Sequence, residues 1–199
     1  MNSLKLGAVA AFAMIAATQA QAQSFYGSVA GGALLPDKSD ITVGTANGNV
    51  KYDTGYSIQT ALGYDFGSGL RTELEFGFND TGFKSFRTAT ATTAIGGGDV
   101  DQLTLHAAGY YDFNAGAAFS PYVGGGLGLT RTDLDAATVG ATSIAGDRAT
   151  DFSAFGEAGV SIPLTDALSV APGVRYSWVD TNGSNFTAWT FKTALRLKF

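Results

Sequence analysis

The sequence predicts an all-β fold: a closed, antiparallel, up-and-down transmembrane β-barrel of eight strands, preceded by a cleaved signal peptide. Three observations predict it. Apolar and polar residues alternate over long runs, short and long connections between the runs follow one another, and aromatic residues gather near the ends of the runs. Alternation with a period of two is typical of a strand whose two faces meet different surroundings.

The composition excludes several functional classes. The 199 residues carry 12 Lys and Arg against 17 Asp and Glu, so the basic surface expected of a nucleic-acid-binding protein is missing. The sequence has no cysteine, which excludes disulfides, thiol catalysis and cysteine-ligated metals. His106 is the single histidine, which excludes a site with several histidine ligands. We therefore expect no metal and no cofactor.

Residues 1–22 have the pattern of a secretory signal peptide. Lys5 supplies the positive charge, an apolar run extends from Leu6 to Ala17, and Ala20 and Ala22 form a small-x-small cleavage site. The run is too short for a transmembrane helix, which needs about 20 residues. The alternative is a short buried or anchoring N-terminal helix. We expect cleavage after Ala22, which leaves one barrel domain over residues 23–199.

The strands follow in order along the chain. A first strand is expected at 24–35, where glycines and alanines leave open which residues face inward. The clearest alternation covers 54–66 and continues over 70–79 after the glycine-containing turn 67–69, which indicates a hairpin. Further alternating runs, joined by short turns at 114–118 and 163–167, indicate strands at 100–113, 119–130, 151–162, 168–178 and 185–199.

The two faces of these strands differ sharply. On the seven strands with a clear phase, the apolar face carries no charged residue. The opposite face carries Asp65, Arg71, Glu73, Glu75, His106, Asp112, Glu157, Arg175, Lys192, Arg196 and Lys198. In a soluble barrel the apolar face would form the core, whereas in an outer-membrane barrel it faces lipid and the polar face fills the lumen.

The lengths of the runs and of their connections favour the membrane arrangement. The runs are about 10–13 residues long, close to the roughly 9–11 that a tilted strand needs to cross a bilayer. Long loops are expected at 36–53, 80–99 and 131–150, the segment 85–95 being a threonine-rich surface loop of low complexity. Within 36–53, a hairpin around Asn47-Gly48 is expected to project above the membrane rather than cross it.

The charged residues of the lumen are expected to form structural ion pairs. Eight strands enclose just enough room for side chains, and a charge buried there must be paired or hydrated. Glu157 and Arg175 are expected at the same height on neighbouring strands, with Glu73 and Glu75 reaching Arg196 or Lys192 across the lumen. The alternative is a gated conductance pathway through the same residues.

The sequence resembles the small eight-stranded outer-membrane barrels, OmpA-like and OmpX-like, over residues 23–199. The resemblance rests on the glycine-rich segment 120–128, on 164–169 followed by 173–176, and on the last five residues. We expect no peptidoglycan-binding domain of the kind that longer relatives carry. The alternating Leu195, Leu197 and Phe199 look like the C-terminal signal that the assembly machinery of this family reads.

The resemblance implies a monomer in the outer membrane of a Gram-negative bacterium, surrounded by lipid and lipopolysaccharide and inserted by the barrel-assembly machinery. The function that we expect is structural or surface-interacting, with loops that contact a host or surface ligand; the alternative is a narrow porin-like channel for ions or small solutes. Enzymatic relatives, which modify lipids or cleave peptides, use a histidine near the outer rim. His106 falls in mid-strand, with Ala108 rather than a serine two residues on, so we expect a hydrogen-bonded lumen histidine and no catalytic site.

Overall fold

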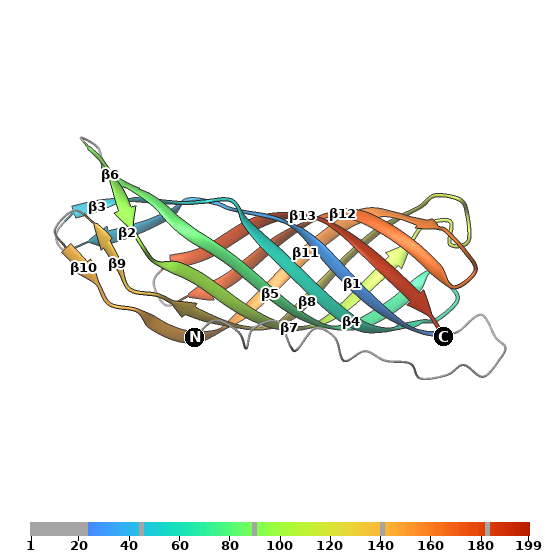
Figure 1. Ribbon diagram of the computed structural model, residues 1–199. Coiled ribbons are helices and arrows are strands. Elements are labelled where there is room, and N and C mark those ends of the chain that lie inside the picture. The colour runs from blue at the N-terminus through green and yellow to red at the C-terminus, as the bar shows by residue number, and fades with distance from the viewer. Residues whose placement is uncertain (1–23, 44–45, 89–90, 140–141, 182–183) are drawn as a thin grey trace, which may run out of the picture.

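The computed structural model describes residues 24–43, 46–88, 91–139, 142–181 and 184–199. Eight long, tilted strands form a closed antiparallel barrel (Figure 1), in which β1 closes the ring by pairing with both β4 and β13. The eight are β1 (Ser24–Pro36), β4 (Gly55–Asp65), β5 (Leu70–Arg87), β7 (Asp99–Asp112), β8 (Ser120–Leu134), β11 (Asp147–Pro163), β12 (Leu168–Thr181) and β13 (Ser184–Lys198). The predicted barrel is confirmed. The predicted signal peptide, with Ala20 and Ala22, lies outside the described residues.

Five shorter strands extend the barrel at one end, on the left of Figure 1. They are β2 (Ser39–Val43), β3 (Ala46–Tyr52), β6 (Thr92–Gly96), β9 (Ala137–Val139) and β10 (Thr142–Ile144). We call this the hairpin end. At the opposite end, the turn end, the strands are joined by the short links 66–69, 113–119 and 164–167.

Two of the predicted long loops are largely strand, so that part of the prediction is wrong. Within 80–99, β5 continues to Arg87 and pairs with β6, and within 131–150, β11 begins at Asp147 and pairs with β8. The threonine-rich segment 85–95 therefore contributes to two paired strands. Threonine is β-branched and suits a strand, and low complexity does not prevent it from pairing with a neighbour.

The expected hairpin within 36–53 is present as β2 and β3, but its turn is not at Asn47-Gly48. Val43 pairs with Ala46, which places Asn47 and Gly48 inside β3. The register is set by burial: Val50 of β3 lies opposite Phe86 of β5, and both side chains are buried. Because a slip of one residue would turn Val50 outward, burial outweighs the turn preference of Asn-Gly.

The orientation of β1, which the sequence left open, is set by its even-numbered residues. Tyr26, Ala30 and Leu34 are buried inside the barrel, whereas Phe25 and Val29 are exposed on the outside. The other strands follow the predicted phase. The exterior is apolar, with Leu74 57% exposed, whereas charged residues such as Arg71 and Arg175 are buried inside. Such an inverted distribution is typical of a barrel that faces lipid.

The first predicted turn shows why the turn end is tight. Phe66 N donates to Leu70 O at 3.0 Å, which closes the link between β4 and β5. Gly67 and Gly69 have φ angles of 74° and 87°, a backbone conformation that glycine adopts without a steric penalty. The predicted hairpin of 54–66 and 70–79 is confirmed.

Aromatic side chains form contacts on the exterior near both ends of the barrel. Near the turn end, the ring centroid of Tyr64 lies 4.9 Å from that of Phe66. Nearer the hairpin end, the centroids of Tyr176 and Trp189 are 4.8 Å apart. Aromatic girdles at two levels are typical of the two interfaces of a membrane barrel.

Candidate functional site in the barrel lumen

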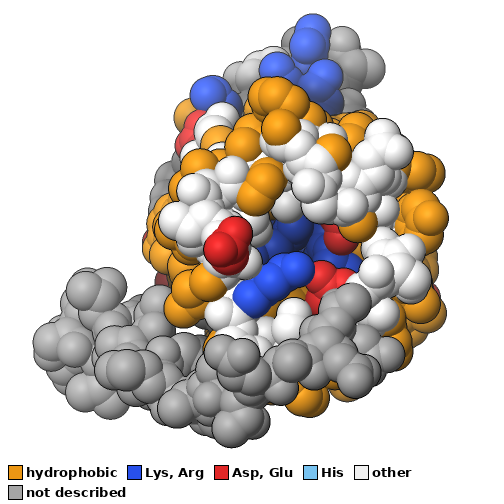
Figure 2. Space-filling view, turned by 90° about the vertical axis from the view of Figure 1, so that its right-hand side faces the viewer, with side chains coloured by type: hydrophobic (Ala, Val, Ile, Leu, Met, Phe, Trp, Pro, Cys, Tyr) orange, Lys and Arg blue, Asp and Glu red, His pale blue; other side chains and the backbone are white. Residues whose placement is uncertain are grey.

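The lumen changes character from the hairpin end to the turn end. Strand β7 shows the sequence of layers, because its inward residues Val100, Gln102, His106 and Tyr110 are all buried. An apolar layer at the hairpin end gives way to neutral polar groups and then to a charged layer. Figure 2, which looks into the turn end, shows Lys, Arg and acidic side chains inside a ring of hydrophobic ones.

Arg175 is the centre of the deeper charged group. The register places Glu157 of β11 directly opposite Arg175 of β12, and the Arg175 Nη2 to Glu157 Oε2 distance is 2.6 Å. Arg175 Nη2 also lies 2.8 Å from Glu75 Oε2, and Lys192 Nζ lies 2.7 Å from Glu157 Oε2. We call these four residues the Arg175 cluster. Its two carboxylates and two cations balance one another.

Two tyrosines complete the hydrogen bonding of these carboxylates. The Tyr122 hydroxyl donates to Glu157 Oε1 at 2.9 Å, and the Tyr110 hydroxyl donates to Glu75 Oε1. The Arg175 guanidinium also lies over the Phe155 ring, with 3.6 Å from Cζ to the centroid. Each buried carboxylate therefore has an ionic partner and a phenol donor, which is the condition under which burial of a charge is tolerated.

A second group lies closer to the turn end. Arg71 forms ion pairs with Glu73, two residues along the same face of β5, and with Asp112, where Nε and Oδ2 are 2.6 Å apart. The Tyr26 hydroxyl donates to Glu73 Oε1 at 2.6 Å. Arg71 also lies over the Tyr110 ring, 4.1 Å from its centroid, so the two groups are in contact through an aromatic side chain.

The partners differ from those that the sequence led us to expect. Glu73 pairs with Arg71 and Glu75 with Arg175, rather than with Arg196 or Lys192. Arg196 lies over the Tyr122 ring at 4.9 Å, and the ion pairs within the described part of the chain do not include it. For Glu73 the reason is proximity, because Arg71 lies two residues away on the same face of β5. Glu75 does reach across the lumen, but to Arg175 of β12 on the opposite side of the ring.

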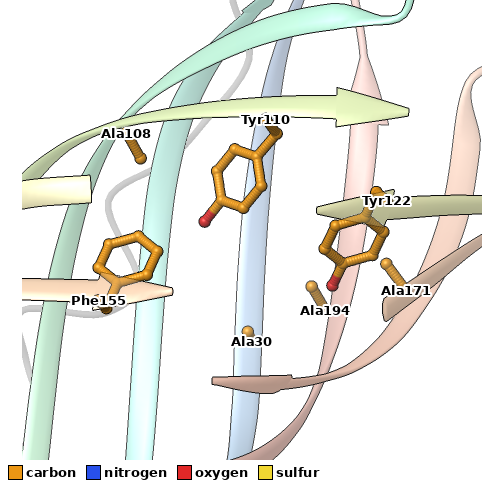
Figure 3. Packing of buried hydrophobic residues seen from close by; sticks show 7 residues of the cluster. All are labelled: Ala30, Ala108, Tyr110, Tyr122, Phe155, Ala171 and Ala194. Carbon is orange, nitrogen blue, oxygen red and sulfur yellow. The ribbon is translucent and has the colours of Figure 1, made fainter. Parts of the chain in front are cut away.

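The sequence analysis did not identify the tyrosines as members of the site, although the glycines that lie against them indicate where large side chains need room. A Cβ atom on Gly63 would overlap the Tyr26 ring, one on Gly124 the Tyr110 ring, and one on Gly173 the Tyr122 hydroxyl. Small residues therefore create the room for large rings, as the core of a narrow barrel requires. Figure 3 shows the same arrangement among Ala30, Ala108, Tyr110, Tyr122, Phe155, Ala171 and Ala194.

His106 lies in the neutral polar layer and is hydrogen-bonded. Its Nε2 is 2.8 Å from Ser153 Oγ, which also accepts a hydrogen bond from Thr130 Oγ1 at 2.9 Å. Within the described residues, His106 Nδ1 has no hydrogen-bond partner. A base that activates a serine is normally oriented by a third group, and no such group is present among these residues. The adjoining cavity of about 20 Å³ has room for about one water molecule.

The residues of the predicted C-terminal signal are not part of the lumen. Leu195 and Leu197 are exposed on the outside of β13, between β1 and β12. Phe199 N donates to Phe25 O at 3.0 Å, which ties the last residue to the first described strand.

Among the described residues, no group of three or more His, Cys, Asp or Glu side chains is placed so that it can hold a metal ion. In the same part of the chain, no helix is long and apolar enough to cross a membrane.

Known structures with the same architecture lie at low sequence identity. Neisserial surface protein A (NspA) has a TM-score of 0.59 at 20% identity, over 90% of this chain and 98% of that one. OprG from Pseudomonas aeruginosa has a TM-score of 0.57 at 17% identity, over 88% of this chain and 96% of that one. The outer membrane protein AlkL has a TM-score of 0.54 at 19% identity, over 94% of this chain and 95% of that one. These likenesses establish the fold.

The family assignment rests on the sequence itself. No curated protein matches the sequence. The family model for the outer membrane protein beta-barrel domain matches residues 7–199, which include every strand of the barrel. Together with the apolar exterior and the polar lumen, this match places the chain in the outer membrane: it belongs to the outer membrane protein beta-barrel family.

Proposed function

We propose that this protein is a plugged barrel that acts at the cell surface, through its hairpin end, rather than as a channel. The observation that carries the proposal is the Arg175 cluster, whose members come from β5, β11, β12 and β13 and meet inside the lumen. In outer-membrane barrels the short turns face the periplasm and the longer connections face outward. The hairpin end is therefore the part that meets other molecules.

The space around the cluster supports a closed lumen. The cavity lined by Glu75, Glu157, Lys192 and Arg196 has a volume of about 10 Å³, and the one next to His106 about 20 Å³. A single water needs about 10–15 Å³ on this measure, so a hydrated ion does not fit. A wider mouth of about 500 Å³ opens at the turn end, and Arg71 and Arg196 are among the residues that line it, whereas no member of the Arg175 cluster does.

Recordings in planar lipid bilayers test the plug. We expect the refolded protein to show no steady openings, and Arg175→Met to raise conductance because it removes the cation that joins Glu75 to Glu157. Lys198→Met is the matched control, since Lys198 Nζ pairs with Asp65 at the turn end, outside the plug. Steady openings of the unaltered protein would favour the alternative function, a narrow channel for ions or small solutes.

Lipopolysaccharide and outer-membrane lipid are the first partners that we propose. Lys84 and Arg87 are exposed on the extension of β5 at the hairpin end, and basic side chains bind phosphate-bearing lipids. We expect the double variant Lys84→Ser with Arg87→Ser to retain less lipopolysaccharide on purification. The turn-end variant Lys198→Ser is expected to retain as much as the unaltered protein. Equal retention by all three would contradict the proposal.

We propose no enzymatic role and a monomeric state. The His106–Ser153 contact lies beside a space of about one water, which leaves no room for a lipid or peptide substrate. A change in lipid A mass or a peptide cleavage that disappears in His106→Ala would revive the third candidate, a lipid-modifying or proteolytic barrel. We also propose that the assembly machinery contacts Leu195, Leu197 and Phe199, whose outward positions leave them accessible before the barrel closes.

A further inference from the structure

A cavity of about 280 Å³ lies inside the hairpin end, beyond the polar layer of the lumen. It is separate from the Arg175 cluster, none of whose four residues lines it. The lining residues are Ser39, Val50, Tyr52, Phe83, Ile95, Val100, Gln102, Thr132, Leu134, Asp135, Ala137, Ala145, Thr181, Asn185 and Phe186. They come from both sides of the barrel and from the short strands β2, β3, β6 and β9, so the hairpins form its outer walls.

The walls of this cavity are predominantly apolar and include three aromatic rings. The Tyr52 ring centroid lies 5.5 Å from that of Phe83 and 5.5 Å from that of Phe186. Val50 and Val100 are buried beside them, at 1% and 3% exposure. An apolar cavity of this kind is not a favourable place for water, because water needs two to four polar partners.

The polar groups of the lining are mostly satisfied by one another. The Tyr52 hydroxyl donates to Ser39 Oγ at 3.2 Å, and burial raises the pKa of Tyr52, so its phenol stays uncharged. At the end nearest the lumen, Gln102 Nε2 donates to Thr132 Oγ1 at 3.5 Å. These pairs leave the carbon surface, rather than free donors and acceptors, turned toward the space.

The barrel wall is lower on one side of the cavity, which provides an entrance. The pairing of β8 with β11 continues as far as Leu134 opposite Asp147. The pairing of β11 with β12 ends at Ser153 opposite Val179, and β12 itself ends at Thr181. In the same register Thr181 is level with Asp151, so four residues of β11, 147–150, rise above the end of β12, which corresponds to about 13 Å of strand. Thr181, which lines the cavity, lies on this low side.

We infer that this cavity binds an uncharged apolar molecule, an alkyl chain of about ten carbons. An engineered protein cavity of about 150 Å³ lined by apolar side chains holds one benzene, so a volume roughly twice as large takes about ten to twelve carbons. Among the described residues that line the cavity, Asp135 is the only charged one and none is lysine or arginine, so a carboxylate would lack a partner there. This inference is independent of the proposed surface function.

The cavity is tested with n-decanol and refolded protein in lipid nanodiscs, with the Ile, Leu and Val methyl groups labelled for NMR. We expect saturable shifts of the lining methyls Val50, Ile95 and Val100. The lipid-facing Leu74 and Leu127 serve as an internal control, because decanol dissolved in the bilayer moves them in proportion to its concentration without saturation. Shifts at Leu74 and Leu127 with none at the lining methyls would by themselves overturn the inference.

A pair of adjacent variants separates the cavity from the surface. Ala137 is buried and lines the cavity, whereas Thr138, its neighbour on β9, is exposed on the other face. Ala137→Phe fills the space and is expected to weaken decanol binding at least tenfold. Thr138→Phe adds the same side chain outside and is expected to leave binding unchanged. Equal binding by the two variants would place decanol elsewhere.

Two further measurements identify whether the ligand is charged and whether it comes from the membrane. Decanoate is expected to bind at least tenfold more weakly than decanol, and equal binding would overturn the assignment of an uncharged ligand. Nuclear Overhauser contacts from the lining methyls to lipid acyl protons, before decanol is added, would assign the alkyl chain to a membrane lipid. Contacts that arise only with decanol would assign it to a free molecule, and the absence of both would refute the inference.

Discussion

The two halves of the barrel interior are built in opposite ways. In the half toward the turn end, charges and tyrosines leave a cavity of only about 10 Å³ around the Arg175 cluster, and the mouth of about 500 Å³ lies outside that cluster. The half toward the hairpin end is apolar and encloses about 280 Å³. Within the membrane the eight strands form a closed ring just wide enough for side chains. Beyond it, β12 and β13 stop while β5, β8 and β11 continue, so the enclosed space widens.

The difference shows that the closed part of the barrel needs buried, closely packed ion pairs, whereas the hairpin end does not. Around the closed part, lipid surrounds an apolar wall, and the cavities inside it hold about 10 and 20 Å³, room for about one water molecule each. Ion pairs there must satisfy one another, and each loss is costly. At the hairpin end ion pairs lie on the outer surface instead, as between Lys84 and Asp53.

Arg175→Met is expected to lower the free energy of unfolding by about 3–5 kcal/mol, because one partner of a buried ion pair is lost while the other stays buried. The Arg175 and Glu75 side chains are only 4% and 5% exposed, so water cannot replace the guanidinium. Reversible urea unfolding in lipid vesicles measures the loss, with the shift of gel migration on boiling as the check on folding.

A second substitution in the Arg175→Met variant identifies the carboxylate that the loss of Arg175 destabilises most. Lys192 still pairs with Glu157 when Arg175 is absent, whereas the ion pairs of the described residues leave Glu75 no other cation. Glu75→Gln is therefore expected to recover more of the Arg175→Met loss than Glu157→Gln does. Strict additivity of the losses in both double variants would show that these groups are not coupled.

Leu74→Arg is expected to hinder insertion, since a cation on the lipid-facing side at mid-membrane depth costs roughly 2–4 kcal/mol. Glu73→Gln changes the adjacent residue, which faces the lumen, and is expected still to insert. The folded fraction in lipid vesicles measures both. Blocked assembly of Glu73→Gln together with normal assembly of Leu74→Arg would reverse the two faces of the barrel.

Gly124→Ala is expected to destabilise the barrel by about 1–3 kcal/mol, the usual cost of overpacking a core. A Cβ atom at this position meets both the Tyr110 ring and the carbonyl oxygen of Gly109. Gly156→Ala is the matched control on an exposed position of β11, where nothing lies within 4 Å of the added carbon. Urea unfolding is expected to show no loss for Gly156→Ala, and a similar loss in both variants would argue against the packing of tyrosine on glycine.

Lys84→Met is expected to change the free energy of unfolding by less than about 1 kcal/mol, because exposed ion pairs are weak. Lys84 Nζ lies 3.1 Å from Asp53 Oδ1, and the two side chains are 63% and 52% exposed. Its small effect is expected to shrink further in high salt, which screens exposed charges. Urea unfolding at two salt concentrations measures both. A loss as large as that of Arg175→Met would remove the distinction between the two halves.

The alternation of apolar and polar residues predicts the strands of the barrel wall, because a period of two can be recognised from consecutive residues alone. The run from Tyr56 to Phe66 and the pair Glu73 and Leu74 are placed on the faces that their chemistry indicates. Strand β1 could not be oriented in this way, since its glycines and alanines suit either face. The extensions of β5 and β11 were equally hidden, because they depend on pairing beyond the membrane, that of β5 with β3 and β6 and that of β11 with β8.

The interior contacts depend on geometry that sequence spacing does not give. Glu75 and Arg175 are 100 residues apart, and only the register and tilt of the whole ring bring them within 2.8 Å. The same applies to His106 of β7 and Ser153 of β11, whose side chains meet because both residues lie opposite Gly128 of the intervening strand β8. Glu157 and Arg175 were expected together because their strands are neighbours and their distances from the shared turn are similar.

The short strands of the hairpin end also have sheet edges, which the closed ring of eight strands avoids. Within the described part of the chain, β10 pairs only with β9, and β2 pairs only with β3. Each of these strands therefore has one row of amides without a backbone partner there. Hydrogen–deuterium exchange should divide the molecule accordingly: amides of the eight barrel strands, bonded on both sides and shielded by lipid, exchange over hours or longer. Amides of β2 and β10 exchange far sooner, so an exchange time course read along the chain marks where the bilayer ends.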